Sequence, residues 1–520
     1  MLRSHHKQGF ILKYIIGTRG SLLALTQCNQ VKDQLEELTG DEFELKVIKT
    51  QGDQIVDKPL WQLEGKDFFT KELDAALLQG EIDLVVHSYK DLGSDRPEGI
   101  RLAAISKRDY AYDILLIKEE TVSKLMAKEL TEFVVGTSSP RRIVNIESSL
   151  SEFLPYGDNV KVSTKMLRGN VNSRIQKLRD DNYDAIVLAM PGIERLAITE
   201  SSRKELEVLL SGMTYAVLPH SQFPAAASQG ALGIECLENR DDNGVLEEKL
   251  FKLQDKDTVS EVSRERKAFA SYGGGCHLAV GINVTKKGDY YIHTHKGKVD
   301  DKVIYERHLE GSFPAPASKA KAFIGLPHAD HREQEYIYCE LIHKEALKNA
   351  RVPNNDVLLS ARYGVSLLKN HGKAVYTAGT STWKLLAQNG QWVHGSCDGL
   401  GEDTLDKIRS SKAIEVLNGP KQELTILTHK DSYSDYGQVF ESYEKSNKEI
   451  RETFLDELRQ CDVFFWTSYS QYKTYVEHLP ELKDKFHACG LGKTFEQLSK
   501  EGVTVRPFAS MEEFKAWLKK

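Results

Sequence analysis

The sequence contains few cysteines, and their arrangement argues against two common ways of stabilising a small domain. The seven cysteines among 520 residues are scattered, odd in number and include no CxxC pair. They indicate neither a disulfide framework nor a zinc knuckle. A reducing cytoplasm is therefore the expected setting.

Long apolar runs and an excess of positive charge are also missing. No stretch reaches the roughly 18 apolar residues that span a bilayer. The short apolar run near the start is broken by Lys13 and is not followed by a small-residue cleavage site. The formal net charge is −6, with 70 Lys+Arg against 76 Asp+Glu. We therefore expect neither a membrane protein nor a nucleic-acid-binding protein.

The remaining composition is that of a soluble protein with several domains, at 40% hydrophobic and 28% charged residues. Short apolar runs alternate with helical patterns, which predicts α/β domains with mainly parallel sheets. KYIIGTRGS and FVVGTSSPRR share one strand, Gly-Thr turn and helix opening. Two similar lobes with a ligand cleft between them are therefore expected.

Both openings place hydroxyl groups at the start of a helix, where unpaired N–H groups attract anions. Ordinary capping by serine and threonine is the alternative interpretation. The two turns carry Thr18, Arg19 and Ser21 in the first case and Thr137, Ser138 and Ser139 in the second.

Basic residues follow these turns and the ends of the predicted strands, where ligands of open α/β sheets bind. Because arginine grips carboxylates with two hydrogen bonds, the pattern indicates a polycarboxylate ligand, with solvated surface arginines as the alternative. The residues are Lys90, Arg141, Arg142, Arg168 and Arg174.

Two further positions could carry chemistry. Asp91 follows Lys90 at a strand end, where a carboxylate among cations either acts on a substrate or serves as an ion-pair partner. Cys276 follows three glycines, which leave a thiol accessible for covalent modification, although a small buried side chain beside a tight turn is the alternative.

The histidines give no metal motif. His328 and His331 fall in a segment rich in proline, alanine and serine, at a spacing that matches no standard zinc site. His293 and His295 lie on one face of an alternating strand, which is weak evidence for a metal. We predict no metal site.

Seven blocks of the sequence occur in an order and spacing that resemble one family. The blocks are IGTRGSLLAL, GKDFFTKELDAALLQGEIDLVVHSYKDL, GTSSPRR, LRGNVNSRIQKL, YDAIVLAMPGIERL, SQGALGIE and GGGCHLAVG. Over about residues 11–312 the chain resembles hydroxymethylbilane synthase, also called porphobilinogen deaminase. Two positions depart from the family pattern: Gly93 stands where a proline is usual, and Ser228 where a glycine is common.

The resemblance implies an enzyme that joins four porphobilinogen units, releases ammonia at each step and hydrolyses off linear hydroxymethylbilane. It implies a dipyrromethane cofactor held by a thioether on Cys276. Asp91 and Lys90 would be the catalytic residues, and the polar stretch near 50–66 would be the family's mobile loop. The residues implied to bind the acetate and propionate groups are Arg19, Ser21, Ser138, Arg141, Arg142, Arg168 and Arg174.

The C-terminal part resembles uroporphyrinogen-III synthase in DVLLSARYGVSLL, VYTAGTSTWKLLAQNG, DVFFWTSYSQYKTYV and FHACGLGKTFEQLSKEGVTV. That family closes hydroxymethylbilane into a macrocycle while inverting the last ring, without a cofactor. The family's usual first strand is not visible in this sequence. Tyr443 stands where the family places a tyrosine that assists loss of the hydroxyl. The candidate hydroxyl donors are Ser360, Thr380, Ser381, Thr467, Ser468 and Thr494.

The predicted fold class is α/β, with two doubly wound lobes of the periplasmic-binding-protein type, a small α+β domain and a two-lobed α/β C-terminal module. The predicted boundaries are 11–110 with 215–238 for lobe 1, 111–214 for lobe 2, 239–312 for the cofactor-carrying domain, 313–334 for a linker and 335–520 for the C-terminal module.

Two other interpretations stay open from the sequence. In one, the C-terminal half is a non-catalytic interaction or stabilising domain. In the other, the lobes belong to a solute-binding protein, against which Cys276 and the absence of an export signal both count. The predicted partner is porphobilinogen, a small polycarboxylate, with no nucleic acid and no membrane. We expect a cytoplasmic monomer.

Overall fold

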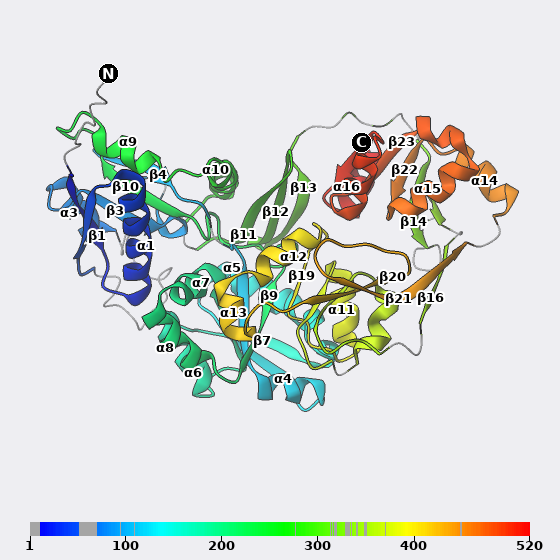
Figure 1. Cartoon of the computed structure of the whole chain (residues 1–520), viewed down its shortest axis with the longest axis horizontal. Helices are drawn as coiled ribbons and strands as arrows, with labels where there is room; N and C mark the ends of the chain where they lie inside the picture. Colours follow the sequence, from blue (N-terminus) through cyan, green and yellow to red (C-terminus); the bar gives the residue numbers. More distant parts are fainter. Residues whose placement is uncertain are drawn as a thin grey trace, which may run out of the picture.

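The computed structural model describes residues 11–50, 70–93, 95–108, 110–275, 277–311, 314, 316, 320–327, 333, 335–339, 342–347, 351–369, 371–447 and 450–520. In this part of the chain, five sheets form the framework of an elongated molecule (Figure 1). Two sheets build the N-terminal lobes, one builds a small third domain, and two build the C-terminal module.

Lobe 1 is a mixed sheet whose central strands are almost wholly buried, as their apolar runs predict. Helix α1 (Leu22–Thr39) begins where the Ser21 hydroxyl accepts a hydrogen bond from Ala24 N (3.3 Å) and ends at Gly40, which has a φ of 72°. Helix α3 (Lys71–Leu78) also packs on this sheet. The strands across the sheet are β2 (Glu42–Val47), β1 (Lys13–Thr18), β3 (Leu84–Ser88), β10 (Leu232–Leu237) and β4 (Ile100–Ile105).

Lobe 2 repeats this plan with its own five-stranded sheet. The strands across it are β7 (Lys161–Lys165), β6 (Glu132–Gly136), β8 (Ala185–Ala189), β5 (Asp113–Lys118) and β9 (Met213–Leu218). The helices are α4 (Glu119–Met126), α5 (Pro140–Ser149), α6 (Val171–Arg179), α7 (Met190–Ile198) and α8 (Glu200–Leu210). Because β9 completes this sheet, lobe 2 runs to Leu218, four residues beyond its predicted end.

The chain crosses between the lobes twice, and Gln229 ties the two crossings together. Its amide nitrogen donates to Ala111 O (2.8 Å) and to Asp113 Oδ1 (3.0 Å). The preceding Ser228 is fully buried, with a φ of 64° and a hydroxyl that has no hydrogen-bond partner. A left-handed backbone costs a residue with a side chain about 1–2 kcal/mol, whereas glycine adopts it freely. This geometry explains why glycine suits the position.

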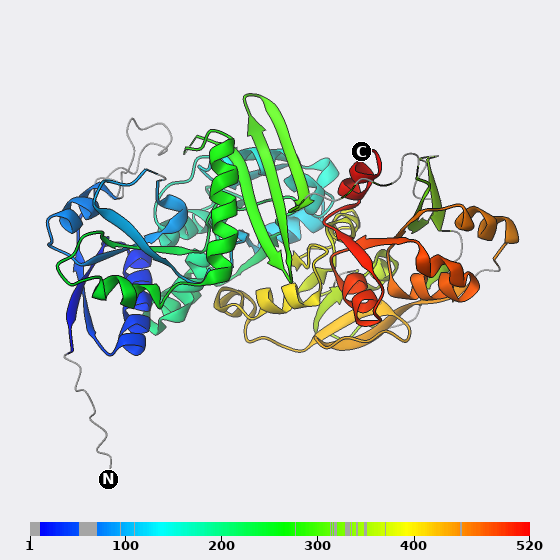
Figure 2. The same ribbon diagram turned by 90° about the horizontal axis from the view of Figure 1, so that it is seen from above.

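The third domain packs a helix on a three-stranded antiparallel sheet, which stands between the lobes and the C-terminal module (Figure 2). Helix α10 (Lys256–Ser271) begins where Asp255 accepts a hydrogen bond from Thr258 N (2.7 Å). The strands are β11 (Ala279–Lys287), β12 (Tyr290–Val299) and β13 (Lys302–Leu309). Helix α9 (Val245–Phe251) falls within the predicted bounds of this domain, 239–312, but packs on lobe 1, because Leu246 and Leu250 join the apolar cluster of α1.

The C-terminal module consists of two α/β lobes. The first has the strand order β16 (Ile342–Ala346), β21 (Gln438–Asn447), β20 (Leu424–His429), β17 (Asp356–Leu359), β18 (Val375–Thr377) and β19 (Gly395–Ser396). Its helices are α11 (Thr380–Gln388), α12 (Glu402–Arg409) and α13 (Lys412–Asn418).

The second lobe has the order β15 (Tyr336–Cys339), β14 (Ala322–Pro327), β22 (Val463–Trp466), β23 (Phe486–Gly490) and β24 (Val505–Phe508). Its helices are α14 (Glu452–Arg459), α15 (Tyr469–His478), α16 (Lys493–Lys500) and α17 (Met511–Leu518).

Strand β14 corrects the prediction of a linker over 313–334. Phe323 and Ile324 are fully buried, and β14 pairs in parallel with both β15 and β22. The apolar run AFIGLP is a strand because its partner β22 follows about 140 residues later and covers it. It also gives the module a first strand that the sequence did not reveal.

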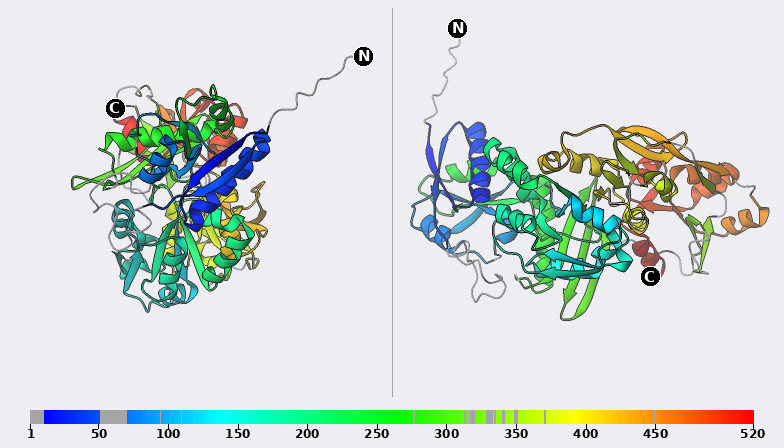
Figure 3. Two further views of the ribbon diagram at one scale, coloured as in Figure 1. Left: turned by 90° about the vertical axis from the view of Figure 1, so that its left-hand side faces the viewer. Right: turned by 90° about the horizontal axis from the view of Figure 1, so that it is seen from below.

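Lobe 2 and the C-terminal module share one core. The edge strands β9 and β19 lie side by side, and Val217 N donates to His394 O (2.8 Å). Two buried indoles cross the boundary: Trp383 Nε1 donates to Phe153 O (3.1 Å) and Trp392 Nε1 to Tyr215 O (3.0 Å). One hydrophobic cluster contains residues of both halves, which adjoin in Figure 1 and in the view from below in Figure 3. The first lobe of the C-terminal module therefore shares its core with lobe 2.

The predicted fold class is confirmed in its layers: two α/β lobes, a small α+β domain and a two-lobed α/β module. Among the described helices, none combines the length and the apolar character needed to cross a membrane.

Candidate active site

A cleft of about 800 Å³ lies between lobes 1 and 2, at the ends of their parallel strands. Lobe 1 contributes the start of α1 and the turn after β3, and lobe 2 contributes the starts of α5 and α6. Ligands of open α/β sheets bind at such strand ends because the helix N-termini point there. The predicted site residues that line the cleft are Arg19, Ser21, Lys90, Asp91, Arg142, Arg168 and Arg174.

The cations of the cleft lower one another's affinity for protons. Burial lowers the pKa of Lys90 to about 8; Asp91 opposes this change, and Arg142 and Arg141 add to it. Burial lowers the pKa of Arg174 to about 10, with Arg142 and Arg168 adding to the effect. Asp91 is exposed to the cleft, where its charge acts on both of these neighbours. The site therefore favours an anion that brings further negative charge.

Asp113, at the start of β5, holds the two arginines of the second opening. Arg141 Nη1 donates to Asp113 Oδ2 (2.6 Å), and Arg142 Nη2 donates to Oδ1 (2.7 Å). Although burial acts to raise it, the pKa of Asp113 stays well below its usual range because of these two guanidinium groups. Asp113 remains ionised and fixes the arginines in place.

Two predicted ligand-binding residues lie behind the cleft instead of lining it. Arg141 is buried, and its guanidinium also donates to Pro224 O (3.2 Å) and to Gln229 Oε1 (3.4 Å). The Ser138 hydroxyl donates to Leu167 O (2.9 Å) and accepts from Leu167 N (3.1 Å). Arg141 thus ties lobe 2 to the crossing segment, and Ser138 positions the turn that carries Arg168.

The lining residues that the sequence analysis missed include Gln27, Lys49, Asn170 and Arg195. Asn170 caps α6 by accepting from Ser173 N (2.9 Å), and its Gly-Asn turn is a signal that could have found it. Arg195 donates from Nη2 to Gly230 O (2.6 Å). Gln27 donates from Nε2 to Ser88 Oγ (3.1 Å). The contacts of Arg195 and Gln27 join segments far apart in sequence, so no local sequence pattern predicts these two residues.

Some predicted features fall outside the described residues. These are Cys276, positions 51–66 of the predicted loop, and His328 and His331 of the linker. The three glycines before Cys276 are described, and Gly273, Gly274 and Gly275 have φ values of 96°, 60° and 92°. Left-handed backbone throughout this turn explains the run of glycines.

Within the described ranges, one group of side chains has the spacing of metal ligands, namely Asp74, His87 and Glu235. Arg96 lies between the carboxylates, donating to Asp74 Oδ1 (2.5 Å) and to Glu235 Oε1 (2.7 Å). The arginine already supplies the positive charge that two buried carboxylates require. The absence of a metal site stays a prediction.

Hydroxyl groups of the C-terminal module gather at the carboxyl ends of its parallel strands. Ser360 follows β17 and donates to Leu427 O (2.9 Å). Tyr443 is buried beside Ser360, with its ring 5.1 Å from that of Tyr363, and burial raises the pKa of Tyr443 to about 12. Thr380 and Ser381 start α11 after β18, at another strand end of the same sheet. This lobe therefore holds four of the predicted C-terminal residues.

The other predicted hydroxyls lie in the facing lobe. Thr467 donates to Gly325 O (2.9 Å), Ser468 caps α15 by accepting from Gln471 N (3.3 Å), and Thr494 donates to Thr467 O (3.3 Å). Lys445 of β21 reaches across and donates to Ser470 Oγ (3.0 Å), 3.2 Å from Ser468 Oγ. The sequence analysis missed Lys445 because its contact with the second lobe forms only when the two lobes pack together.

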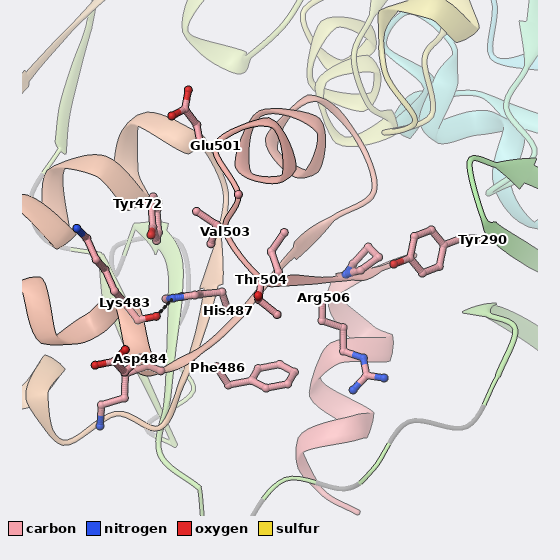
Figure 4. A pocket seen from close by; sticks show the side chains of 14 residues that line it. Tyr290, Tyr472, Lys483, Asp484, Phe486, His487, Glu501, Val503, Thr504 and Arg506 are labelled. Carbon is pink, nitrogen blue, oxygen red and sulfur yellow. Dashed lines mark hydrogen bonds between the residues drawn. The ribbon is translucent and has the colours of Figure 1, made fainter.

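The second C-terminal lobe has another hollow, of about 830 Å³, at the amino ends of β23 and β24 (Figure 4). Between the lining residues drawn in Figure 4, a hydrogen bond joins His487 Nε2 to Lys483 O (3.3 Å). The charged side chains of the hollow point in different directions. The hollow lies at the opposite strand ends from Ser468 and Thr494. The facing hydroxyl groups are therefore the better candidate site of this module.

Comparisons with known proteins identify the N-terminal half. A family model described as "Porphobilinogen deaminase, dipyromethane cofactor binding domain" matches residues 14–245. The porphobilinogen deaminase of a Nitratiruptor species is 40% identical over 275 residues, which are 53% of this chain and 79% of that protein. The porphobilinogen deaminase of Oceanobacillus iheyensis is 36% identical over 313 residues, which are 60% of this chain and 93% of that protein.

Likenesses to solved structures are weak. Uroporphyrinogen-III synthetase from Helicobacter pylori matches with a TM-score of 0.27 and 15% identity, covering 38% of this chain and 99% of that one. A probable amino-acid ABC transporter extracellular-binding protein from Bacillus subtilis matches with a TM-score of 0.28 and 11% identity, covering 51% of this chain and 94% of that one. The assignment therefore rests on the sequence relatives. The chain belongs to the porphobilinogen deaminase family, and the family domain that it contains binds a dipyrromethane cofactor.

Proposed function

We propose that the cleft between lobes 1 and 2 condenses four porphobilinogen molecules into hydroxymethylbilane with release of ammonia. The observation that carries this proposal is the charge of the cleft. Among its described lining residues, seven are lysine or arginine, and Asp91 is the one carboxylate. Each pyrrole of the substrate brings two carboxylates, which relieve the mutual repulsion of these cations.

The residues of the cleft also fit the dipyrromethane cofactor. Arg168 Nε is buried without a hydrogen-bond partner, as expected of a group that awaits an anionic ligand. A volume of about 800 Å³ is suitable for a group of this size with a further ring. The cofactor, when bound through Cys276, supplies the pyrrole to which the chain is added. Arg19, Ser21, Arg142, Arg168 and Arg174 hold carboxylates, and Asp91 stabilises positive charge beside Lys90.

The first test removes one cation of the cleft. We expect Arg168→Leu to lower kcat/KM for porphobilinogen about 10- to 100-fold, because a charged hydrogen bond contributes about 1.5–3 kcal/mol. Ammonia release measures the rate. The control is Arg101→Leu, since Arg101 is an exposed partner of Glu247 outside the cleft. Equal rates for both variants would contradict a role of Arg168 in carboxylate binding.

We also propose that the C-terminal module cyclises hydroxymethylbilane to uroporphyrinogen III. The two facing lobes present hydroxyl groups and Lys445, which are suitable donors for a flexible chain with eight carboxylates. Tyr443, kept protonated by burial, is the candidate proton donor to the leaving hydroxyl. The alternative is that this module only stabilises the deaminase, which the core shared with lobe 2 would explain.

Isomer analysis distinguishes the two roles of the module. Without a cyclase, hydroxymethylbilane closes spontaneously to the type I isomer. We expect the full chain, fed with porphobilinogen, to give the type III isomer after oxidation of the products. Tyr443→Phe combined with Ser360→Ala should shift the product towards type I while ammonia release stays unchanged. Type I from the unaltered chain would show that the module is not a working cyclase. Point variants suit this test better than truncation, because removing the C-terminal module would expose the core that it shares with lobe 2 to solvent.

A further inference from the structure

Helix α7 contacts both sides of the proposed substrate cleft. Pro191, Gly192 and Arg195 of this helix line the cleft. A Cβ atom on Gly192 would lie 3.6 Å from Val171 of lobe 2 and 3.7 Å from Leu23 of lobe 1. The helix is therefore packed closely against α1 of the opposite lobe, and a small displacement of α7 would change the width of the cleft.

On the same helix, Glu194 faces the C-terminal module. Its Oε1 accepts from Lys412 N (3.0 Å) and its Oε2 from Ala413 N (2.8 Å), at the first two residues of α13. Ser411 Oγ accepts from the third, Ile414 N (3.1 Å). The first three N–H groups of α13 are thus satisfied, two of them by one carboxylate of the deaminase half.

The contact is shielded from water. Glu194 is 7% exposed, and Ile193, Leu196, Ala413 and Ile414 belong to one buried cluster. The views in Figures 1 and 3 place α13 beside α7 and α8. At the rim, Arg203 of α8 pairs with Glu415 of α13 (3.0 Å). Charged hydrogen bonds in such surroundings are strong and fix geometry closely.

We propose that the C-terminal module positions α7 through Glu194 and thereby sets the substrate affinity of the deaminase cleft. Glu194 is a positioning residue, because it touches neither the cleft nor the reacting atoms. It acts through Arg195 and Gly192, which move with it as parts of one helix. The inference rests on the proposed deaminase function of this cleft. By linkage, a ligand in the cleft also strengthens the docking of α13.

The test replaces Glu194 with glutamine in the full chain, which removes the charge and keeps the size. We expect the KM for porphobilinogen to rise about tenfold, while kcat per cofactor-loaded enzyme stays within about twofold. Amide exchange should accelerate in α13 and also in α7. Glu194→Asp, which keeps the charge one methylene further back, should give an intermediate KM. The control Glu207→Gln, which alters an exposed partner of Arg203 on α8, should leave KM and both exchange rates unchanged.

Two results would overturn the inference. In one, Glu194→Gln accelerates exchange in α13 but leaves α7 exchange and KM unchanged, so that the contact serves only the C-terminal module. In the other, kcat and the cofactor-loaded fraction fall while KM stays constant, as for a general loss of folding. Failure of this inference differs from failure of the proposed function. If the proposed function were wrong, the unaltered chain would consume no porphobilinogen. Amide exchange in α7 of Glu194→Gln would still show whether α13 and α7 are coupled.

Discussion

Cys276→Ser is expected to give a protein that lacks the covalent two-pyrrole group and releases no ammonia from porphobilinogen. A thiolate forms the thioether, whereas a serine hydroxyl is a far weaker nucleophile at neutral pH. The other six cysteines of the chain are all buried. Burial raises the pKa of Cys28 and Cys236 to about 11 and that of Cys461 and Cys489 to about 12, which makes these thiols poor nucleophiles.

Intact mass spectrometry measures this outcome directly. The unaltered protein should carry the mass of two pyrroles, and Cys276→Ser should have the mass of the bare chain. The matched control is Cys236→Ala, at a buried position on β10, which should keep both the added mass and the activity. An active unaltered protein without added mass, or a control that loses it, would refute the assignment to Cys276.

Asp91→Asn is expected to lower the turnover of porphobilinogen about 10²- to 10³-fold, the usual effect of removing a preorganised charge from a reacting centre. Asp91 ends the short 3-10 helix η2 (Tyr89–Asp91) and is exposed to the cleft. Its carboxylate can face the positive charge that forms on the pyrrole when ammonia departs. Asparagine keeps the shape of the side chain but not its charge, so the fold and the bound cofactor should persist.

Mass spectrometry during turnover should show stalled complexes of Asp91→Asn with one or more added pyrrole units. The control is Glu98→Gln, an exposed carboxylate in the loop after Asp91 that does not line the cleft. Nearly normal turnover of Asp91→Asn would mean that Asp91 serves only as an ion-pair partner of the neighbouring cations.

The neighbours Arg141 and Arg142 show where prediction from sequence stops. Both were predicted to bind carboxylates, yet Arg142 lines the cleft and Arg141 lies behind it. Consecutive helix residues point about 100° apart, so the two arginine side chains leave α5 in different directions. Which one lines the cleft depends on Asp113 and Gln229, 28 and 88 residues from Arg141 along the chain.

The strand ends of the cleft could be predicted from local sequence patterns. Apolar strands followed by Gly-Thr and Lys-Asp turns fix locally where Arg19, Lys90 and Asp91 sit, because α/β topology brings the carboxyl ends of parallel strands to one edge. The packed fold was needed to show that β14 is a central strand and that Glu194 caps α13, since β22 and α13 lie more than 100 residues from β14 and Glu194 along the chain. The strain at Ser228 likewise comes from the crossing segments, which no local pattern encodes. Local sequence patterns specify the secondary structure and the polarity of each segment. Which distant segment it packs against depends on how the whole chain folds.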